Sequence, residues 1–512
     1  MIAAIKVFPN AYVDSVVQLR GMRAMREVEG VEWASAAMAT PANLEILRTE
    51  GVEPATVTAA GSNDFFLVVR ASTEAICALA LAAGETAVTS STAPPDDAGH
   101  TDAPSSLREA VRDQPDSNVA VISVPGDYAA LAAVQALSAD LHVLLFSDNV
   151  PVAKEIALKD HALSRGRLLM GPGAGTAMLG GVGLGFANVV RPGPVGIVAA
   201  AGTGAQEAMS LLDRWGVGVS QVIGVGGRDV SGEVGGRMTK AAVRALRDDP
   251  ATEVILFVSK PPAPDVAAEV LATAGDTPLV AALIGLDPGF PAPPGVVLAD
   301  TLESGVVATL GAFGMHAPDT TTTEGPSVEQ VCSRLAPDRR RVRGLFSGGT
   351  LCYESLVVLG RTIGEVHSNT PINKAWAMPA PEGSHQCLDL GEEEYTRGRP
   401  HPMIDPEARI ELLGQHAQDP QVAVIILDVV LGHGSDPAPA RTLAPACRSA
   451  MADGGPQIVA YVLGTDQDPQ GFAGQREALV QAGCIVTPTA ARASLVAAAI
   501  ATRDLGMARM PL

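Results

Sequence analysis

The amino-acid sequence predicts a multidomain α/β protein built from doubly wound parallel sheets. Its apolar runs are continuous rather than alternating, as in parallel strands that helices cover on both faces. Examples are VILFVS (254–259) and VAVIILDVV (422–430). Segments rich in Ala and Leu separate the runs at βαβ spacing. The 512 residues exceed what one core can hold, so we expect three to four domains.

Residues 1–90 are predicted to form a small N-terminal α/β domain. We expect strands at Ile2–Phe8 and Asp64–Val69 and helices at Asp14–Met25 and Ser72–Ala83. A linker rich in Pro, Asp and Ser follows at 91–117. Residues 118–191 then have the strand–helix–strand pattern of a Rossmann-like domain.

Two further doubly wound domains of the flavodoxin-like type are expected. The first, 192–316, has strands at 194–200, 254–259 and 278–285 and a helix from about Thr203 to Trp215. A second linker at 317–340 leads to the other domain, 341–512, which repeats the pattern. Within it the stretch 366–407 is long and polar, and such a stretch is usually functional or disordered.

Charge and cysteine content exclude several classes of function. The net charge of -20 opposes binding to nucleic acid or to an anionic membrane. The six cysteines form no C-x-x-C pair, and no metal cluster of ordinary spacing appears, so we expect no metal. No signal peptide opens the chain, and no apolar run reaches the roughly 18–20 residues that span a bilayer. We therefore expect a cytoplasmic protein with a small-molecule ligand.

Two Gly-rich turns follow predicted strands and open helices. Ligands of open parallel sheets bind at the carboxyl ends of strands, and the N–H groups of a helix start can hold an anion. The candidate phosphate-binding residues are Gly202, Thr203 and Gly204 in the first turn and Ser347, Gly348, Gly349 and Thr350 in the second. Glu207 and Glu354 follow within the helices as candidate substrate ligands. The sequence leaves open whether the turns face one ligand or two.

The first turn alone is explained slightly better by a tight strand-to-helix connection that Thr203 caps. It is not a G-x-G-x-x-G fingerprint, and the sequence contains neither G-x-x-x-x-G-K-[ST] nor G-x-S-x-G. The repetition of the turn is what favours an anion site, because two helix starts that face one ligand add their positive fields.

Three other loops contain candidate residues. One follows a strand with the candidate substrate ligands Gly226, Gly227 and Arg228, and its alternative is a loop that makes room for a neighbour. Another follows the strand at 422–430 with the candidate substrate ligands Gly432, Gly434 and Asp436 and the candidate catalytic residue His433. A histidine between glycines at a strand end is expected to be exposed.

The third loop contains several cationic hydrogen-bond donors, although the chain as a whole is acidic. It contains Arg397, a candidate phosphate ligand, and the candidate catalytic residues Arg399 and His401. Arginine suits bidentate recognition of carboxylate or phosphate. The alternative is a solvated loop held by Glu392–Glu394.

Several segments resemble the succinyl-CoA synthetases. The segments similar to the alpha subunit are MGPGAGTAML (170–179), VISVPGDYAA (121–130), PGPVGIVAAAGTGAQE (192–207) and VIGVGGRDVSG (222–232), and VAVIILDVVLGHGSDPAPA (422–440) is similar to the C-terminal domain of the beta subunit. The whole chain resembles the FdrA family more closely. That resemblance is carried by KVFPNAYVDSV (6–16), AGSNDFFLVV (60–69), LFSGGTLCYES (345–355), YTRGRPHPMID (395–405) and LGHGSDPA (431–438).

The resemblance implies a Rossmann-like domain of the CoA-binding type at 118–191 and two succinyl-CoA-synthetase-like domains at 192–316 and 341–512. The sequence also departs from the synthetases. They carry a phosphohistidine in a G-H-A-G-A motif, whereas the corresponding stretch, 285–312, contains no His. Residues 1–90 replace the Gly-rich CoA loop, and no room remains for an ATP-grasp domain.

The part of the synthetase site that this sequence retains, the Gly-rich helix starts, implies chemistry on an acyl phosphate. The first expectation is a subunit of a transferase that moves a carbamoyl group between carbamoyl phosphate, as co-substrate, and a small amide or amine acceptor of the oxamate type. Other protein subunits and a homo-oligomer are implied as partners. The second is an acyl-CoA ligase whose nucleotide-binding subunit is a partner, with CoA or a nucleotide as ligand. The third is a non-catalytic scaffold that binds a phosphorylated metabolite.

Overall fold

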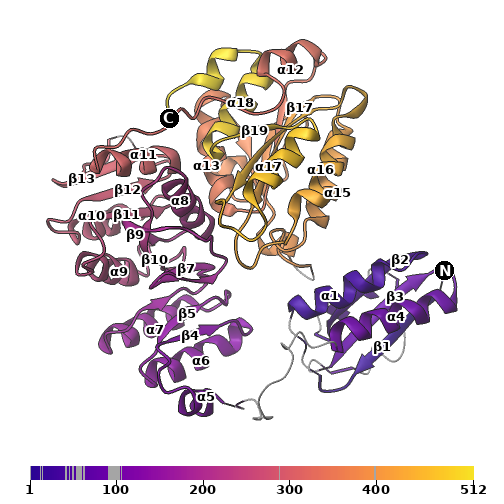
Figure 1. Ribbon diagram of the computed structural model, residues 1–512, viewed down its shortest axis with the longest axis horizontal. Coiled ribbons are helices and arrows are strands. Elements are labelled where there is room, and N and C mark those ends of the chain that lie inside the picture. Colours follow the sequence, from indigo (N-terminus) through magenta and orange to yellow (C-terminus); the bar gives the residue numbers. More distant parts are fainter. Residues whose placement is uncertain are drawn as a thin grey trace. The chain divides into compact units, whose positions relative to one another are not determined.

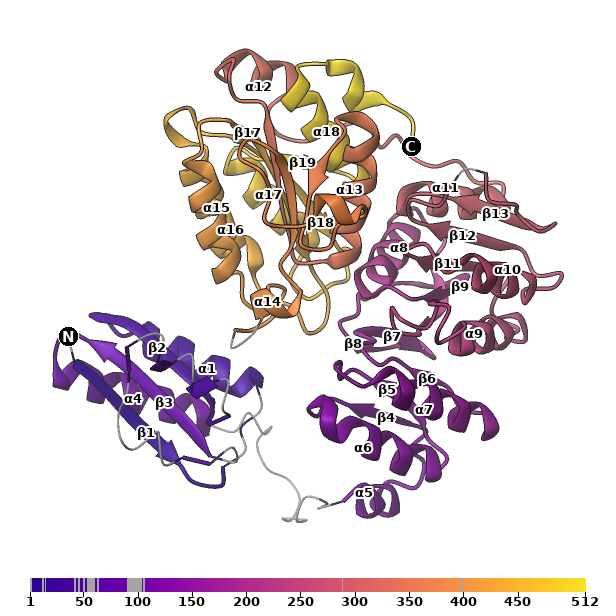
Figure 2. The same ribbon diagram turned by 180° about the vertical axis from the view of Figure 1, so that it is seen from behind.

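A computed structural model gives the fold of the chain and divides it into two units. One comprises residues 1–103 and 393–400, and the other comprises residues 104–392 and 401–512. Figures 1 and 2 show their elements from opposite sides. The residues described are 2–512, except for 12, 14, 41–42, 45–46, 49–50, 53–59, 62–63, 90–103, 105, 288 and 397–398. Most of the linker expected at 91–117, and Arg397, thus lie outside the described residues.

The described residues of the first unit contain a three-stranded antiparallel sheet and helices. The strand order is β1 (Ile2–Phe8), β3 (Phe65–Ala71), β2 (Val31–Met38), and the helices are α1 (Ser15–Arg26) and α4 (Glu74–Thr89). The short helix α14 (Glu393–Thr396) also belongs to this unit. Strand β3 is buried on both faces, because its alternate side chains enter two separate apolar clusters. The sequence missed β2, whose small Ala and Ser side chains form no apolar run.

The second unit begins with a three-stranded parallel sheet of order β4 (Val119–Ile122), β5 (His142–Leu145), β6 (Leu169–Met170). Its helices are α5 (Leu107–Asp113), α6 (Gly126–Ser138) and α7 (Val152–Ser164). Ala129, Ala133 and Leu137 of α6 are fully buried, because they lie on one face of the helix and small side chains allow close packing.

A seven-stranded sheet follows, with the order β13-β12-β11-β9-β10-β7-β8. The strands are β7 (Thr176–Leu179), β8 (Val182–Gly185), β9 (Pro192–Ala199), β10 (Val219–Gly224), β11 (Val254–Ser259), β12 (Leu279–Leu283) and β13 (Val296–Ala299). All are parallel except the hairpin of β7 and β8. The helices are α8 (Gly202–Arg214), α9 (Arg237–Arg247), α10 (Pro264–Ala272) and α11 (Leu302–Ala312).

The last sheet has six parallel strands in the order β15-β16-β14-β17-β18-β19. They are β14 (Arg341–Phe346), β15 (Val366–His367), β16 (His385–Asp389), β17 (Val422–Val430), β18 (Gln457–Leu463) and β19 (Ile485–Thr487). The helices are α12 (Val328–Arg334), α13 (Gly349–Thr362), α15 (Glu407–Ala417), α16 (Pro439–Ala450), α17 (Phe472–Gln481) and α18 (Ala490–Thr502). The polar stretch 366–407 therefore contains two strands, which its sequence did not reveal.

Both large sheets reverse their strand order at the strand that precedes a Gly-rich turn. In the seven-stranded sheet, β10 lies on one side of β9 and β11 on the other. In the six-stranded sheet, β16 and β17 flank β14 in the same way. Such switch points leave a crevice at the carboxyl ends of the strands, where ligands of doubly wound sheets bind. Helices α8 and α13 start at these two points.

One apolar core joins the two large sheets. It contains buried residues of α8 and α11 from the first and of α13 and α18 from the second. Helix α8 is buried along almost its whole length, from Gly204 to Asp213. Because α8 and α13 lie in the same core, their N-terminal ends are held in a fixed relation. Within the described residues, no helix is long and apolar enough to cross a membrane.

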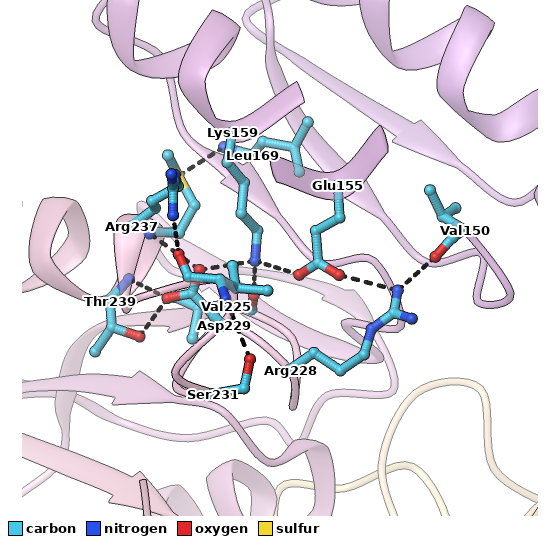
Figure 3. Close-up of polar contacts among 12 residues, drawn as sticks. Val150, Glu155, Lys159, Leu169, Val225, Arg228, Asp229, Ser231, Arg237 and Thr239 are labelled. Carbon is cyan, nitrogen blue, oxygen red and sulfur yellow. Dashed lines mark hydrogen bonds and ion pairs between the residues drawn. The ribbon is translucent and has the colours of Figure 1, made fainter. Parts of the chain in front are cut away.

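A buried ion network ties α7 to the loop that follows β10 (Figure 3). The Lys159 ammonium, 0% exposed, lies 2.8 Å from a carboxylate oxygen of Glu155 and 2.8 Å from one of Asp229. Asp229 also accepts hydrogen bonds from the backbone N–H and hydroxyl of Thr239, at 2.7 and 2.6 Å, near the start of α9. The guanidinium of Arg228 pairs with Glu155 at 2.9 Å and donates to the carbonyl of Val150 at 2.7 Å.

We expect Lys159→Met to lower the free energy of unfolding by about 3–5 kcal/mol, because removing one partner leaves buried carboxylates without their counter-charge. Urea unfolding of the full chain measures the change. Lys154→Met is the matched control, since Lys154 lies on the same helix and is exposed. Equal midpoints for the two variants would contradict a stabilising role for the network.

Candidate functional site

The two Gly-rich turns predicted from the sequence meet at one pocket of about 540 Å³. Seven of the candidate residues line it: Gly202, Thr203, Gly227, Ser347, Gly349, Thr350 and His401. Six polar or charged residues that the sequence did not single out as ligands also line it: Asp148, Thr176, Gln206, Lys260, Asp389 and Glu392. The two turns therefore face one cavity, which the sequence left open.

The first turns of α8 and α13 touch each other. The backbone N–H of Thr350 donates to the hydroxyl oxygen of Thr203 at 3.3 Å. A Cβ at Gly348 would lie 2.9 Å from the Thr203 methyl carbon, and one at Gly204 would lie 2.9 Å from the Thr350 methyl carbon. Only glycine at these two positions lets the two helix starts approach this closely.

Neither helix start is capped by the residue that precedes it. The residue before α8 is Ala201 and the residue before α13 is Gly348, and neither supplies an oxygen to the first-turn N–H groups. A helix start carries about half a positive charge, and two such starts at one cavity favour an anion there. The Lys260 side chain adds a full positive charge to the lining, and its ammonium lies 5.0 Å from the ring centroid of Tyr353.

A buried ion pair fixes the turn before α13. The Asp428 carboxylate accepts from the backbone N–H groups of Ser347 at 2.8 Å and Gly348 at 2.7 Å. The guanidinium of Arg409, which is also buried, donates to Asp428 at 2.7 Å. These two N–H groups and that of Thr350 are thus committed to the protein, and the donors left for a ligand come from the rest of the first turn of α13 and from α8.

Asp389 and His401 bring acid–base groups to the pocket. Burial and the neighbouring Glu392 raise the pKa of Asp389 to about 7, against the opposite effects of Lys260 and of a hydrogen bond from Gly391. Burial, with a smaller contribution from Arg409, lowers the pKa of His401 to about 4, so the ring is neutral at pH 7. Its Nδ1 accepts from the backbone N–H of Met403 at 3.3 Å, which places the ring proton on Nε2.

Two candidate glutamates lie in the helix packing and not in the pocket lining. Glu207 accepts a hydrogen bond from the Tyr461 hydroxyl, and burial raises the pKa of its carboxyl to about 7. Glu354 accepts from the backbone N–H of Leu302 at 2.6 Å, and burial raises its pKa to about 8. Both carboxyls connect α8 or α13 to neighbouring elements of the core.

The remaining candidates lie outside the pocket lining. Arg228 belongs to the buried network of Figure 3. His433 is exposed, as the sequence predicted, and its backbone N–H donates to Ala187. Gly226, Gly432, Gly434 and Asp436 are likewise absent from the lining. Arg399 belongs to the first unit, and Arg397 is not among the described residues.

Lys260 and Asp389, two lining residues that the sequence analysis did not predict, differ in how strongly the sequence indicated them. Lys260 directly follows β11, so the rule that ligands bind at strand ends was enough to find it. Asp389 ends β16, whose short sequence HQCLD has no apolar run, and the strand itself was missed.

Among the described residues no group of three or more His, Cys, Asp or Glu side chains can hold a metal ion. Cys352 is buried, and burial holds its pKa well above the usual range, so it is no thiolate nucleophile.

Comparison with known proteins is consistent with this architecture. The family model "CoA-ligase" matches residues 345–500, "CoA binding domain" matches 190–282, and "AllF, heavy metal-associated domain" matches 1–104. The chain is 39% identical over 508 residues to the "Uncharacterized protein YahF" of Escherichia coli K12, covering 97% of this chain and 98% of that protein. It therefore belongs to the succinyl-CoA-synthetase-like FdrA family, on a scaffold of the acyl-CoA ligase type.

More distant relatives match only in part. The alpha subunit of an ADP-forming succinate–CoA ligase from Aquifex aeolicus is 30% identical over 197 residues, which cover 37% of this chain and 62% of that subunit. A solved acetyl-coenzyme A synthetase from Ca. Korarchaeum cryptofilum, in complex with phosphate and ADP, is 15% identical, with coverage of 76% and 84% and a TM-score of 0.30. At that score the structural likeness carries no argument.

The two glycines that begin the helices differ in the space around them. A Cβ at Gly349 would collide with the Asp389 carboxylate, whereas one at Gly202 would make an ordinary contact of 3.7 Å with the Thr176 hydroxyl oxygen. We therefore expect Gly349→Ala to lower the thermal unfolding midpoint and Gly202→Ala to leave it nearly unchanged. Of these two glycines, only Gly349 thus has a close contact at the Cβ position. Equal midpoints for the two variants would contradict this difference.

The raised pKa of Glu354 makes stability depend on pH. Its folded pKa of about 8 exceeds the usual value of 4.5, so the folded state holds a proton that the unfolded state loses. This contribution is fully present below pH 4.5 and is lost as pH rises through about 8. We expect Glu354→Gln to remove a slope of about 1.4 kcal/mol per pH unit within that window. Urea midpoints across this range measure it, and Glu329→Gln, at an exposed position of α12, is the control.

Proposed function

We propose that the pocket binds the phosphoryl group of an acyl phosphate and that this chain is a subunit of an enzyme that transfers the acyl group. The observation that carries the proposal is the convergence on one cavity of two helix starts that the preceding residues do not cap, with Lys260 in the cavity wall. Both features favour a multiply charged oxyanion. A phosphate that leaves an acyl carbon gains negative charge, so the same groups stabilise it more as the bond breaks.

The acceptor that the family matches favour is the thiol of CoA. Models for a CoA-ligase and for a CoA binding domain match the two large domains, and a succinate–CoA ligase alpha subunit is among the relatives. The pocket wall also contains the rings of Phe146 and Phe186, whose centroids are 5.8 Å apart, and the side chain of Met403. Such an apolar wall suits the uncharged arm of CoA. In this proposal a partner subunit supplies the nucleotide.

A second candidate is carbamoyl transfer between carbamoyl phosphate and a small amide or amine. The observation that favours it is the absence of histidine from 285–312, where the synthetases that the chain resembles have their phosphohistidine. Without that relay, a preformed acyl phosphate is the simpler substrate. The cavity of about 540 Å³ has room for a small acyl phosphate and a small acceptor. Partner subunits and a homo-oligomer belong to both proposals.

The chain's own residues act in the same way under either proposal. The first-turn N–H groups of α8 and α13 orient the phosphoryl group, and Lys260 neutralises part of its charge. Holding the acyl carbon beside the acceptor supplies much of the remaining rate enhancement. The neutral His401 ring lines the pocket with its proton on Nε2, so it can donate a hydrogen bond without adding charge.

Thermal unfolding of the full chain with inorganic phosphate, acetyl phosphate, carbamoyl phosphate, CoA and ATP tests the proposal. A ligand that binds only the folded state raises the midpoint. We expect phosphate and the acyl phosphates to raise it. Stabilisation by CoA as well supports the ligase reaction, and stabilisation by carbamoyl phosphate without CoA supports carbamoyl transfer. If neither inorganic phosphate nor an acyl phosphate raises the midpoint, the anion site is overturned. If phosphate raises the midpoint but the chain together with its partner subunits shows no turnover, the chain is a binding scaffold.

The lysine provides a sharper test of the same site. Lys260→Gln is expected to weaken phosphate binding about 10-fold or more, because a hydrogen bond to a charged group contributes about 1.5–3 kcal/mol. Calorimetric titration with inorganic phosphate measures the affinity. Lys154→Gln removes the same charge from an exposed position on α7 and serves as the control. Equal losses in both variants would point to the overall charge of the protein and not to the pocket.

A further inference from the structure

Asp389 gives the pocket a carboxyl group that phosphate binding alone does not use. The residue ends β16, is 3% exposed, and lines the cavity. Asn369 fixes its backbone from both sides. The side-chain amide of Asn369 donates to the carbonyl of Asp389 at 2.8 Å, and its oxygen accepts from the backbone N–H of Asp389 at 2.9 Å. The position of the carboxyl group is therefore set before any ligand binds.

The two oxygens of this carboxyl group have different surroundings. Oδ1 accepts a hydrogen bond from the backbone N–H of Gly391 at 3.0 Å. Oδ2 lies so close to Gly349, the first residue of α13, that a Cβ there would collide with it. One oxygen thus holds the loop, and the other stands at the helix start where the phosphoryl group is proposed to bind. An acid–base group beside a leaving phosphate can exchange protons with both reactants.

We propose that Asp389 accepts the proton of the nucleophile that attacks the acyl phosphate and then passes it to the departing phosphate. This inference rests on the proposed function. The nucleophile, a thiol or an N–H compound, gives its proton to Asp389 as its lone pair forms a bond to the acyl carbon. The bond from the acyl carbon to the phosphate oxygen breaks, and its electron pair leaves with the phosphate. That phosphate takes the proton from Asp389 and is released as hydrogen phosphate, so the carboxylate is regenerated.

The charged groups around Asp389 suit this role. Glu392 and Asp428 oppose its ionisation, while Lys260 and the Gly391 N–H favour it. Their balance with burial leaves the pKa of the carboxyl at about 7. His401, with its lowered pKa, adds no charge at that pH. A proton acceptor works best when its pKa lies near the working pH, because it is then ionised without being too weak a base.

Proton exchange on anion binding tests the inference in the full chain without any partner subunit. Calorimetric titration with inorganic phosphate, in two buffers of different ionisation enthalpy at about pH 7.5, counts the protons taken up. A dianion beside Asp389 raises its pKa, so the wild-type protein is expected to take up a larger fraction of a proton than Asp389→Asn. Glu382→Gln is the control, because Glu382 is an exposed carboxylate that precedes the opposite end of β16.

The outcomes separate the two proposals. If inorganic phosphate does not bind the wild-type protein, the proposed function fails. If it binds and the proton uptake of Asp389→Asn equals that of the wild type, the anion site stands and the role of Asp389 is overturned. The expected result is a loss of uptake in Asp389→Asn alone, with phosphate still bound.

A kinetic measurement addresses the transfer step itself. The probe is acetohydroxamate formation from acetyl phosphate and hydroxylamine, counted above the uncatalysed rate. We expect Asp389→Asn to lower kcat by roughly 10²–10⁴-fold, the usual contribution of general acid–base catalysis. The wild-type kcat is expected to rise with pH near 7, and this rise is expected to be absent from Asp389→Asn. Replacing a residue with a purely structural role would not remove the pH dependence. A catalysed rate that survives the substitution overturns the assignment.

Discussion

Helices α8 and α13 begin in contact, and the rest of the second unit depends on that contact. Gly204 and Gly348 have no side chains where Thr350 and Thr203 approach, so the two helix starts come together with only a threonine hydroxyl between them. The continuous core of α8, α11, α13 and α18 then holds both helices in place. Two positive helix ends brought this close repel each other unless an anion lies nearby. The arrangement is therefore one that gains stability from a ligand.

The elements around the pocket are held by buried ionic groups as well as by apolar packing. Asp428 and Arg409 fix the turn before α13, and Lys159 with Asp229 fixes the loop that contributes Gly227. Burying such groups costs desolvation energy, which only well-formed pairs and hydrogen bonds offset. These ion pairs position the pocket, since each network fixes the backbone of a pocket loop. Preorganised donors act on a transition state without having to move first.

Much of this architecture was accessible from the sequence, because strong local signals specify it. Continuous apolar runs such as VAVIILDVV predicted β17, and the strand-then-glycine pattern predicted both helix starts. The polar stretch 366–407, which the sequence indicated to be functional or disordered, supplies Asp389 and His401 to the pocket. Strand β16 was missed because five residues with little apolar character give no periodic signal. Glu207 and Glu354 were assigned to the ligand because a glutamate in a helix looks the same whether its carboxyl faces a cavity or a neighbouring helix.

The sequence by itself determined the fold class, the family and the residues that open α8 and α13, because each depends on neighbours along the chain. The tertiary structure decided which of those residues share one cavity. It showed that Arg228 is held in an ion network, that Cys352 is buried, and that Asp389 and Lys260 reach the pocket from separate sheets. These outcomes depend on packing between segments that are far apart in the sequence. No local sequence pattern predicts contacts between such distant segments, so only the tertiary structure shows them.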